Sequence, residues 1–205
     1  MKKLETIKTY YKSNMGENVP EYSILGWESE KAQHLRFEIL SNSVDLRRRK
    51  LLDVGCGTGN LAEFILNRNI DIKYTGIDIL EDMISLAKRK NLKADFYCMD
   101  IFKSNPFFEG SFDVVYSSGI FNLDLGNNKS FLSSAVELFL NLANEAIVFN
   151  LLHFRSPSRE DKYFYFDPDE VLKLLGTYSE KINKISIVEQ YLKNDFTVVL
   201  LKNKS

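Results

Sequence analysis

The stretch LLDVGCGTGN, residues 51–60, decides the fold of this chain. An apolar run ends at Val54, the three glycines Gly55, Gly57 and Gly59 follow at alternate positions, and a helical pattern begins at once. Glycine is needed where the backbone turns with positive φ or approaches a ligand closely. The stretch is therefore a candidate nucleotide-binding loop between a buried strand and a helix. A tight turn without a ligand is the alternative.

The spacing of these glycines distinguishes between the classes of nucleotide that the loop could bind. A dinucleotide fingerprint has the pattern GxGxxG, and Asn60 stands here in the place of its last glycine. The Walker pattern fails as well, because no Gly-Lys-Ser/Thr follows. Both pyrophosphate-binding interpretations are weakened, including that of a nicotinamide oxidoreductase.

Strand and helix patterns alternate after residue 50. Apolar periodicity predicts strands at 50–55, 73–78, 94–100, 111–118 and 145–152, and helices at 60–69, 80–91, 130–143 and 167–176. Two further strands, 184–192 and 195–202, are joined by the short turn Lys193-Asn194, which predicts an antiparallel hairpin. Alternation of this kind predicts an α/β fold with a mostly parallel, doubly wound sheet, whose ligands lie at the carboxyl ends of the strands.

Acidic residues occur at the ends of the successive strands. Asp53 precedes the glycines, Asp78 ends the second strand and Asp100 ends the third. An acid at the second strand end can accept hydrogen bonds from both hydroxyls of a ribose. An ionised carboxylate after the third strand can accept from the amino group of an adenine. Asp53 lies where a cationic ligand would gain from a nearby carboxylate. Each acid taken singly has the alternative of a loop or cap residue.

Composition narrows the class of protein further. The chain has 205 residues, 27 basic and 28 acidic side chains, and 13% aromatic residues. A net charge of -1 disfavours a dedicated nucleic-acid binder, and no apolar run is long enough to cross a membrane. Cys56 and Cys98 have no metal-ligand spacing, so no metal site is predicted. The N-terminus lacks the apolar segment of a signal peptide, so we expect a cytoplasmic protein.

Four segments together resemble the successive motifs of class I S-adenosylmethionine-dependent methyltransferases of the small-molecule type. They are LLDVGCGTGN, YTGIDI, FYCMDI and FDVVYSSGIFN, and the resemblance covers roughly residues 50–150. It implies a seven-stranded sheet of order 3-2-1-4-5-7-6 with the last strand antiparallel. It also implies S-adenosylmethionine as cofactor. We expect a Rossmann-like methyltransferase domain at 46–205, preceded by a helical extension or lid at 1–45.

The resemblance also assigns cofactor contacts. It implies that the loop from Asp53 to Asn60 surrounds the methionine part and that Asp78 binds the ribose. The adenine would lie against Ile79 and Met83 and against Asp100 and Ile101, with Ser117 and Ser118 beside the sulfonium. The full set of predicted cofactor-binding residues is Asp53, Gly55, Cys56, Gly57, Gly59, Asn60, Asp78, Ile79, Met83, Asp100, Ile101, Ser117, Ser118 and Arg36.

The segment after the fourth strand departs from part of the family. Members that methylate amide or amino nitrogens often carry an Asn/Asp-Pro-Pro-Tyr type motif there, whereas this chain has Ser117-Ser118-Gly119-Ile120. The departure favours a small-molecule acceptor. It also leaves open a non-catalytic cofactor-binding module or partner subunit. Asn122 is a weak candidate for orienting an acceptor, with an Asx turn as the alternative.

Two segments are candidates for binding the acceptor. The stretch 150–167 carries His153, the one histidine placed to act as a base, together with Arg155 and Tyr163; structural and solvent-exposed roles are the alternatives. In the N-terminal region, Trp27 could form an aromatic wall or pack in the core, and Arg36 could pair with the methionine carboxylate. The predicted partner is thus a small molecule; no oligomeric state is predicted.

Residues typical of helix caps occur near the start and in the last fifth of the sequence. Ser29 is a predicted N-cap for a helix in SEKAQHLRFEILSNS, whose apolar stripe would include Leu35 and Ile39. Asp167 is a predicted N-cap with Pro168 at the first helical position, and Gly176 is the predicted C-cap of the same helix.

Overall fold

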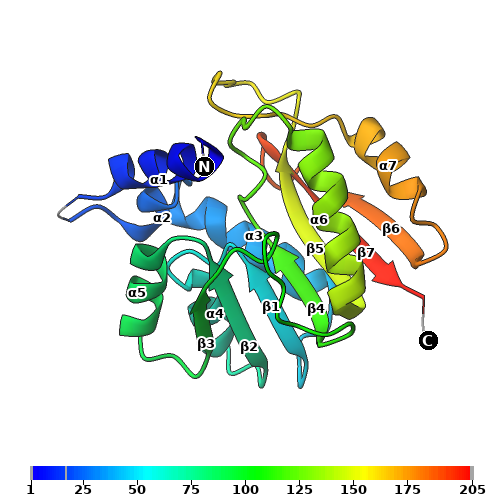
Figure 1. Cartoon of the computed structure of the whole chain (residues 1–205), viewed down its shortest axis with the longest axis horizontal. Coiled ribbons are helices and arrows are strands. Elements are labelled where there is room, and N and C mark those ends of the chain that lie inside the picture. The colour runs from blue at the N-terminus through cyan, green and yellow to red at the C-terminus, as the bar shows by residue number, and fades with distance from the viewer. Residues whose placement is uncertain (1, 17, 204–205) are drawn as a thin grey trace.

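The computed structural model describes residues 2–16 and 18–203. The strands are β1 (Lys50–Val54), β2 (Lys73–Asp78), β3 (Asp95–Cys98), β4 (Phe112–Ser117), β5 (Ala143–Leu152), β6 (Ile182–Val188) and β7 (Asp195–Lys202). The helices are α1 (Lys2–Asn14), α2 (Glu21–Ile24), α3 (Glu30–Ser43), α4 (Asn60–Leu66), α5 (Glu81–Arg89), α6 (Asn128–Leu142) and α7 (Pro168–Gly176). Figure 1 shows α1 and α2 lying across the upper edge of the sheet.

The strands form one seven-stranded sheet in the order β3-β2-β1-β4-β5-β7-β6. The neighbours from β3 to β5 run parallel, whereas β7 is antiparallel to both β5 and β6. The predicted fold class and strand order are confirmed. The register places Asp53 of β1 beside Gly76 of β2 and Tyr116 of β4, so the acidic end of β1 lies in the middle of the sheet.

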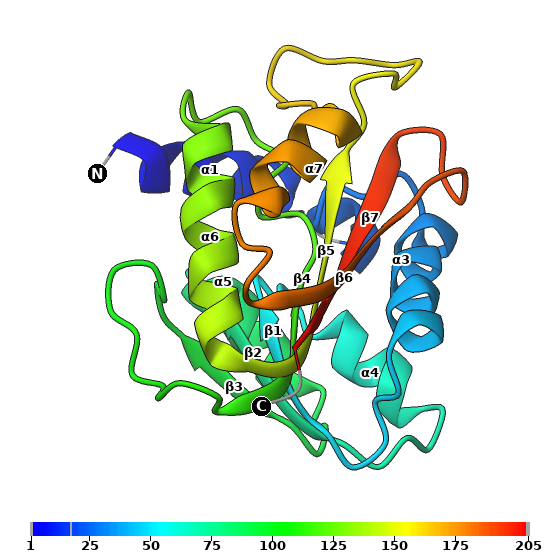
Figure 2. The same cartoon turned by 90° about the vertical axis from the view of Figure 1, so that its right-hand side faces the viewer.

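Helices cover both faces of the sheet (Figure 2). One core cluster joins α6 and α7 to the sheet through residues such as Phe139, Val171 and Phe149. The other joins α3, α4 and α5 through residues such as Leu40 and Ile65. Because both faces are buried, the central strands are apolar on both sides, as a parallel sheet requires. These two layers hold the carboxyl ends of β1, β2 and β4 at one edge.

The C-terminal hairpin differs from its prediction in its connection. The two strands are antiparallel, but β6 ends at Val188, so six residues rather than two lead to β7. Asn194, expected in the turn, instead accepts a backbone hydrogen bond from His153 at 2.7 Å and a side-chain hydrogen bond from Ser156 at 3.0 Å. The strand pairing therefore ends early, because the connection is bonded to the loop after β5.

The predicted caps are partly confirmed. Ser29 accepts a hydrogen bond from Ala32 N at 3.1 Å, and Asp167 accepts one from Asp169 N at 2.9 Å. Gly176 is not a C-cap: it is the last residue of α7, and Thr177 follows with φ −69°. The helix ends in tight turns and needs no left-handed residue.

The buried stripe of α3 also differs from its prediction. The buried face includes Ala32, Arg36 and Leu40, whereas Leu35 and Ile39, which were expected on it, are half-buried. Among the described residues, no helix is long and apolar enough to cross a membrane.

Two glycines allow a test of the loop that follows β1. Gly55 has φ +79°, and a Cβ at this position would lie 2.3 Å from Ile120 Cγ2. We expect Gly55→Ala to destabilise the protein by ~1–3 kcal/mol in urea unfolding, because strain and overlap add. Gly176 has no neighbouring atom within 4 Å of an added Cβ. Gly176→Ala should be neutral or stabilise the helix by up to ~1 kcal/mol, and equal effects of the two changes would contradict the argument.

Candidate functional site

The glycine loop is bonded to the end of β2. Gly55, Gly57 and Gly59 all have positive φ, of +79°, +54° and +78°. Gly55 N donates to Ile77 O at 2.8 Å, and Gly57 N donates to Asp78 Oδ2 at 3.0 Å. The loop therefore curves around the strand end and leaves the Asp78 carboxylate beside the cavity that it encloses.

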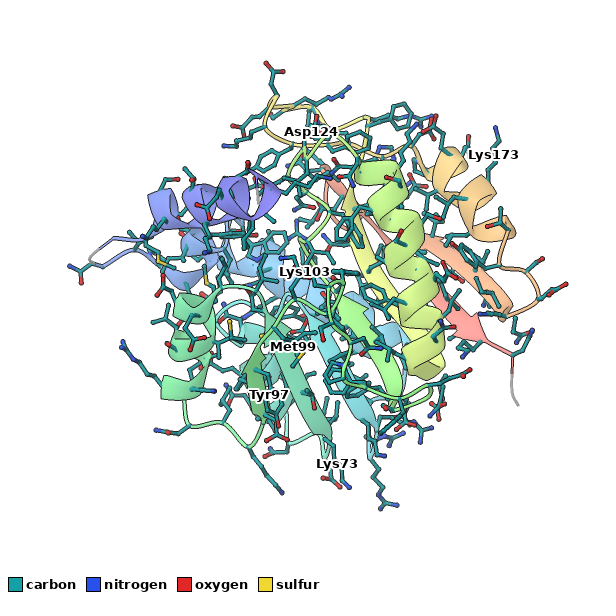
Figure 3. All side chains as sticks on the ribbon, viewed as in Figure 1. Lys73, Tyr97, Met99, Lys103, Asp124 and Lys173 are labelled. Atoms are coloured by element: carbon teal, nitrogen blue, oxygen red, sulfur yellow. The ribbon has the colours of Figure 1, made fainter. Side chains whose placement is uncertain are left out.

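Two adjoining cavities lie at this edge of the sheet. The smaller, of about 50 Å³, is lined by Tyr11, Leu25, Trp27, Gln33, Phe37, Asp53, Gly55, Cys56, Gly57, Asn60, Leu61, Asp78, Leu80, Met83, Tyr116 and Ser118. The larger, of about 550 Å³, extends from Asp78, Ile79, Asp100 and Ile101 across Met99 and Lys103 to Gly119, Ile120, Leu123, Leu125 and Phe131. Figure 3 labels Met99 and Lys103 near the centre of the molecule. Tyr11, Gly55, Asp78, Leu80 and Ser118 line both cavities and mark their junction.

The sequence predicts most of the sheet-side lining. Of the predicted cofactor residues, Asp53, Gly55, Cys56, Gly57, Asn60, Asp78, Met83 and Ser118 line the smaller cavity, and Ile79, Asp100 and Ile101 line the larger one. Ser118 Oγ is buried and has no hydrogen-bond partner among the described residues. A buried hydroxyl without a partner is costly, so this atom is available to a ligand.

Ser117, Gly59 and Arg36 line neither cavity. The hydroxyl of Ser117 is fully buried, and it donates to Val54 O of the neighbouring strand at 2.9 Å. Gly59 caps α4, where an added Cβ would meet Phe96 and Ala87. Arg36 instead forms a buried ion pair with Asp195. The structure thus gives the predicted cofactor contacts of these three residues no support.

The Asp53 carboxyl is buried at the base of the smaller cavity. Its side chain accepts a short hydrogen bond from the hydroxyl of Tyr74. Burial raises the pKa of Asp53 to about 7, the Tyr74 hydrogen bond opposes this shift, and the charge of Asp78 adds to it. No lysine or arginine among the described residues lines this cavity. A cationic group bound here would favour the ionised form of Asp53.

The other two strand-end acids have different surroundings. Asp78 accepts backbone hydrogen bonds from Gly57 and from Leu80, the latter at 2.9 Å. Burial raises the pKa of Asp78, and these backbone hydrogen bonds oppose the shift. Asp100 is closer to solvent and pairs with Lys103 at 2.9 Å. Each carboxylate oxygen has a second lone pair, so both side chains can still accept from a ligand.

The N-terminal helices supply the rest of the lining. Leu4, Ile7 and Tyr11 of α1 line the larger cavity, and Leu25 closes onto the glycine loop, with Cδ2 at 2.6 Å from the place of a Cβ on Gly57. Sequence reasoning missed Leu4, Ile7 and Leu25. The helical spacing of the residues at 4, 7 and 11 is a signal that could have found the apolar face of α1.

The N-terminal helices are also joined to the domain by polar contacts. Glu21 of α2 accepts hydrogen bonds from Thr58 Oγ1 at 3.1 Å and Lys90 Nζ at 2.7 Å. Lys90 also donates to Asn60 Oδ1, and Asn60 Nδ2 donates to Gln33 Oε1 of α3. Asn60, in the place of a dinucleotide-binding glycine, thus links three helices beside the smaller cavity.

Of the candidates for acceptor chemistry, Trp27 lines the smaller cavity, whereas His153, Arg155 and Tyr163 line neither cavity. His153 Nε2 pairs with Glu189 at 2.9 Å and its Nδ1 accepts from Arg155 N, which is a structural arrangement. Arg155 is exposed, with its guanidinium 5.1 Å from the Phe154 ring. Tyr163 shares a hydrogen bond of 2.7 Å with Tyr10 of α1. The lining of the two cavities therefore gives no support to His153 as a base of this site.

Asn122 does not form the Asx turn that its sequence context favours. Its Oδ1 is buried without a partner among the described residues, while its backbone O accepts from Phe164 N at 2.8 Å. Its side chain is not part of the lining of either cavity.

The fold and the site together define the class of protein. A sheet of order 3-2-1-4-5-7-6, a glycine loop after its first strand and acids after its second and third are the architecture of class I S-adenosylmethionine-dependent methyltransferases. Residues 51–139 match the family described as "Methyltransferase domain". The chain is therefore similar to this superfamily in sequence and in fold, and S-adenosylmethionine is the cofactor that these similarities support.

Individual relatives agree with this assignment. A Mycobacterium tuberculosis protein classed as a methyltransferase is 27% identical over 159 residues, which cover 73% of this chain and 91% of that protein. The malonyl-(acyl-carrier protein) O-methyltransferase of Acetivibrio thermocellus is 32% identical over 136 residues, covering 60% of this chain and 47% of that enzyme. The small-subunit ribosomal RNA methyltransferase C of Haemophilus influenzae is 30% identical over 120 residues, covering 56% and 35%. The chain thus spans less than half the length of these two enzymes.

Solved structures show the same fold. One is the 1,6-didemethyltoxoflavin-N1-methyltransferase of Burkholderia thailandensis, determined with its substrate and S-adenosylhomocysteine. It has 17% identity and a TM-score of 0.66, and the match covers 98% of this chain and 87% of that one. Magnesium protoporphyrin IX methyltransferase of Synechocystis, with S-adenosylhomocysteine bound, has 13% identity and a TM-score of 0.64 over 97% of this chain and 94% of that one.

Burial of the Asp53 carboxyl at the base of the smaller cavity lowers the stability of the ligand-free protein at neutral pH. The pKa of Asp53 is about 7 in the folded protein against 3.8 as its ordinary value. The unfolded chain therefore loses this proton first, and stability falls as the pH rises from about 4 to 7. We expect Asp53→Asn to increase the free energy of unfolding of the ligand-free protein by at most ~4 kcal/mol at pH 8, which raises the melting temperature by several degrees. At pH 4 the same change should have little effect on the melting temperature.

A matched change provides the control for this experiment. Asp113 near the start of β4 accepts a hydrogen bond from Lys50 N at 2.8 Å, at the opposite edge of the sheet. Asp113→Asn should not stabilise the protein at pH 8. A melting temperature of Asp53→Asn below that of the wild type at pH 8 would show that the ionised carboxyl is compensated.

Proposed function

We propose that this chain transfers a methyl group from S-adenosylmethionine to a small, largely apolar molecule by direct in-line displacement. The observation that carries the proposal is the cavity of about 550 Å³ that adjoins the smaller one and is lined in part by α1 of the same chain. Its size is within the range of small-molecule sites. Its far end is lined by Ile120, Leu123, Leu125 and Phe131.

The residues at the edge of the sheet fit the cofactor. When bound, S-adenosylmethionine supplies an electrophilic methyl group on a positively charged sulfur. We expect the glycine loop and Asp53 to hold the methionine part, since a buried carboxyl without a cation is present there. Asp78 would accept from the ribose, and Asp100 from the adenine. The junction at Ser118 would then hold the sulfur between the two cavities.

The chemistry expected of the acceptor follows from the lining of the larger cavity. Among the described residues, no histidine or cysteine lines it, and its carboxylates lie at the end expected to hold the adenosine. Orientation of a nucleophile supplies much of the rate of such a displacement. We therefore expect an acceptor atom that is nucleophilic without help from a general base. The apolar end of the cavity would position it and exclude water.

Binding of the cofactor tests the first part of this proposal. Calorimetry with S-adenosylhomocysteine should give saturable binding, and Asp78→Asn should weaken it by about 10- to 100-fold, because one carboxylate oxygen becomes a donor facing backbone N–H groups. Asp113→Asn, far from the cavities, should bind as the wild type does. Absence of binding at millimolar S-adenosylhomocysteine would refute the proposal.

The position of the acceptor is tested by filling the apolar end of the cavity. Leu125→Trp should leave the affinity for S-adenosylhomocysteine within about twofold and reduce transfer of labelled methyl from S-adenosylmethionine into a bacterial small-molecule extract by at least about tenfold. Leu172→Trp, on the exposed side of α7, is the matched control. Methyl transfer to ribosomal RNA instead would contradict a small-molecule acceptor. Cofactor binding without transfer to any fraction would favour the non-catalytic module.

A further inference from the structure

The tryptophan of this chain lies on the wall of the smaller cavity. Trp27 is the single tryptophan in the sequence. The edge of its ring lies over Gly119, because a Cβ there would lie 3.2 Å from Trp27 Cη2 and 3.3 Å from Cζ2. Gly119 follows Ser118, which marks the junction of the two cavities. The indole therefore packs where the methionine part and the acceptor are expected to meet.

A buried cation stacks on this indole. The guanidinium carbon of Arg36, on α3, lies 4.2 Å from the centroid of the Trp27 ring. Arg36 is 5% exposed, and one of its terminal nitrogens donates to Ala32 O at 2.6 Å. A desolvated contact of this kind is stronger than one in water. The ring is thus packed between the loop after β4 and a fixed cation.

Asp195 fixes this cation. Its Oδ2 accepts from Arg36 Nε, pairs with a second guanidinium nitrogen, and accepts from Asn150 Nδ2 at 3.1 Å. Asp195 is the first residue of β7 and is 1% exposed. Because β7 is antiparallel to β5, its first residue lies at the edge where β5 ends, close to the cavities.

Stability alone does not explain a buried ion pair. The loss of hydration offsets much of the attraction, and apolar replacements of similar volume are often neutral or stabilising. A planar guanidinium that makes two bonds to one carboxylate has, however, a defined orientation. Stacking on the guanidinium then fixes the orientation of the indole ring. Pairing with Asp195 also neutralises the cation beside a site expected to hold a sulfonium.

We propose that Arg36 and Asp195 are positioning residues that hold the Trp27 ring against Gly119 and thereby shape the wall of the cofactor site. This inference rests on the proposed function, since it requires the methionine part of the cofactor to bind in the smaller cavity. It gives Arg36 an indirect role in place of the predicted contact with the methionine carboxylate.

A double-mutant cycle on the full chain tests whether Arg36 acts through Trp27. Calorimetry with S-adenosylhomocysteine should show that Arg36→Lys, which keeps the charge but loses the planar stack, weakens binding by about 3- to 10-fold, and that Trp27→Phe does so as well. Adding Arg36→Lys to Trp27→Phe should change the affinity by less than about twofold, since the effects of coupled residues do not add.

A matched control and an optical measurement accompany the cycle. Arg68 also stacks on a ring, 3.4 Å from the Phe64 centroid, and pairs with Glu38 at 3.7 Å, but it lies outside both cavities. Arg68→Lys should leave the affinity for S-adenosylhomocysteine unchanged. Because Trp27 is the single tryptophan, its emission reports on this ring alone, and Arg36→Lys should shift the emission maximum of the ligand-free protein.

The outcomes separate this inference from the function on which it rests. If the wild type does not bind S-adenosylhomocysteine, the proposed function fails and the inference with it. If the wild type binds but Arg36→Lys binds equally well, or its effect adds to that of Trp27→Phe, the inference alone is overturned. Should Arg36→Lys fail to fold, the charge-free R36M/D195N takes its place with the same expected weakening. Failure of both to fold would show that the pair only maintains the fold.

Discussion

Two backbone N–H groups donate to one carboxylate, and the geometry of the site depends on this arrangement. Gly57 N reaches Asp78 Oδ2 at 3.0 Å from the glycine loop, and Leu80 N reaches Asp78 Oδ1 at 2.9 Å from the start of α5. A single side chain at the end of β2 thereby fixes the loop after β1 and the helix after β2 together. The loop then presents Gly57, with φ +54°, to Leu25, so a side chain at position 57 would be strained and would displace Leu25. Because the glycine loop has this shape, Leu25 of the N-terminal segment can pack directly against it.

The same arrangement concentrates negative charge where no described cation compensates it. Asp53 and Asp78 are neighbours at adjacent strand ends, and the charge of Asp78 contributes to the raised pKa of Asp53. The ligand-free protein thus carries an electrostatic cost that a bound cation removes. A ligand that binds only the folded state stabilises that state. If the cofactor binds as proposed, its affinity and the folding stability are linked through these two buried carboxyls, and a site optimised for the cofactor is not optimised for the empty protein.

The sequence predicted what is local along the chain and missed what is brought together by folding. The strands, the glycine loop and the strand-end acids follow from patterns within a few residues, whereas the strand order was implied by the family resemblance, and the structure agrees with both. Ser117 and Ser118 could not be told apart from the sequence, because adjacent residues at a strand end point in different directions, and of the two only Ser118 lines the cavities. The Arg36–Asp195 pair spans 159 positions, and no spacing in the sequence connects its members. The short hairpin turn failed for a similar reason, since Asn194 is bonded to the distant loop at His153.

Long-range contacts also assign different tasks to the segments around the larger cavity. Part of its apolar lining comes from α1 and from residues 119–131, whereas residues 153–166 contribute none. The latter nevertheless support the wall: Phe164 N donates to Asn122 O, Asp124 N donates to Lys162 O, and Tyr163 bonds to Tyr10 of α1. On the proposed function, substitutions in the supporting loop would change the shape of the acceptor site without touching an acceptor. The strand-end acids lie on a separate part of the fold, so acceptor choice would change while the proposed cofactor site is retained.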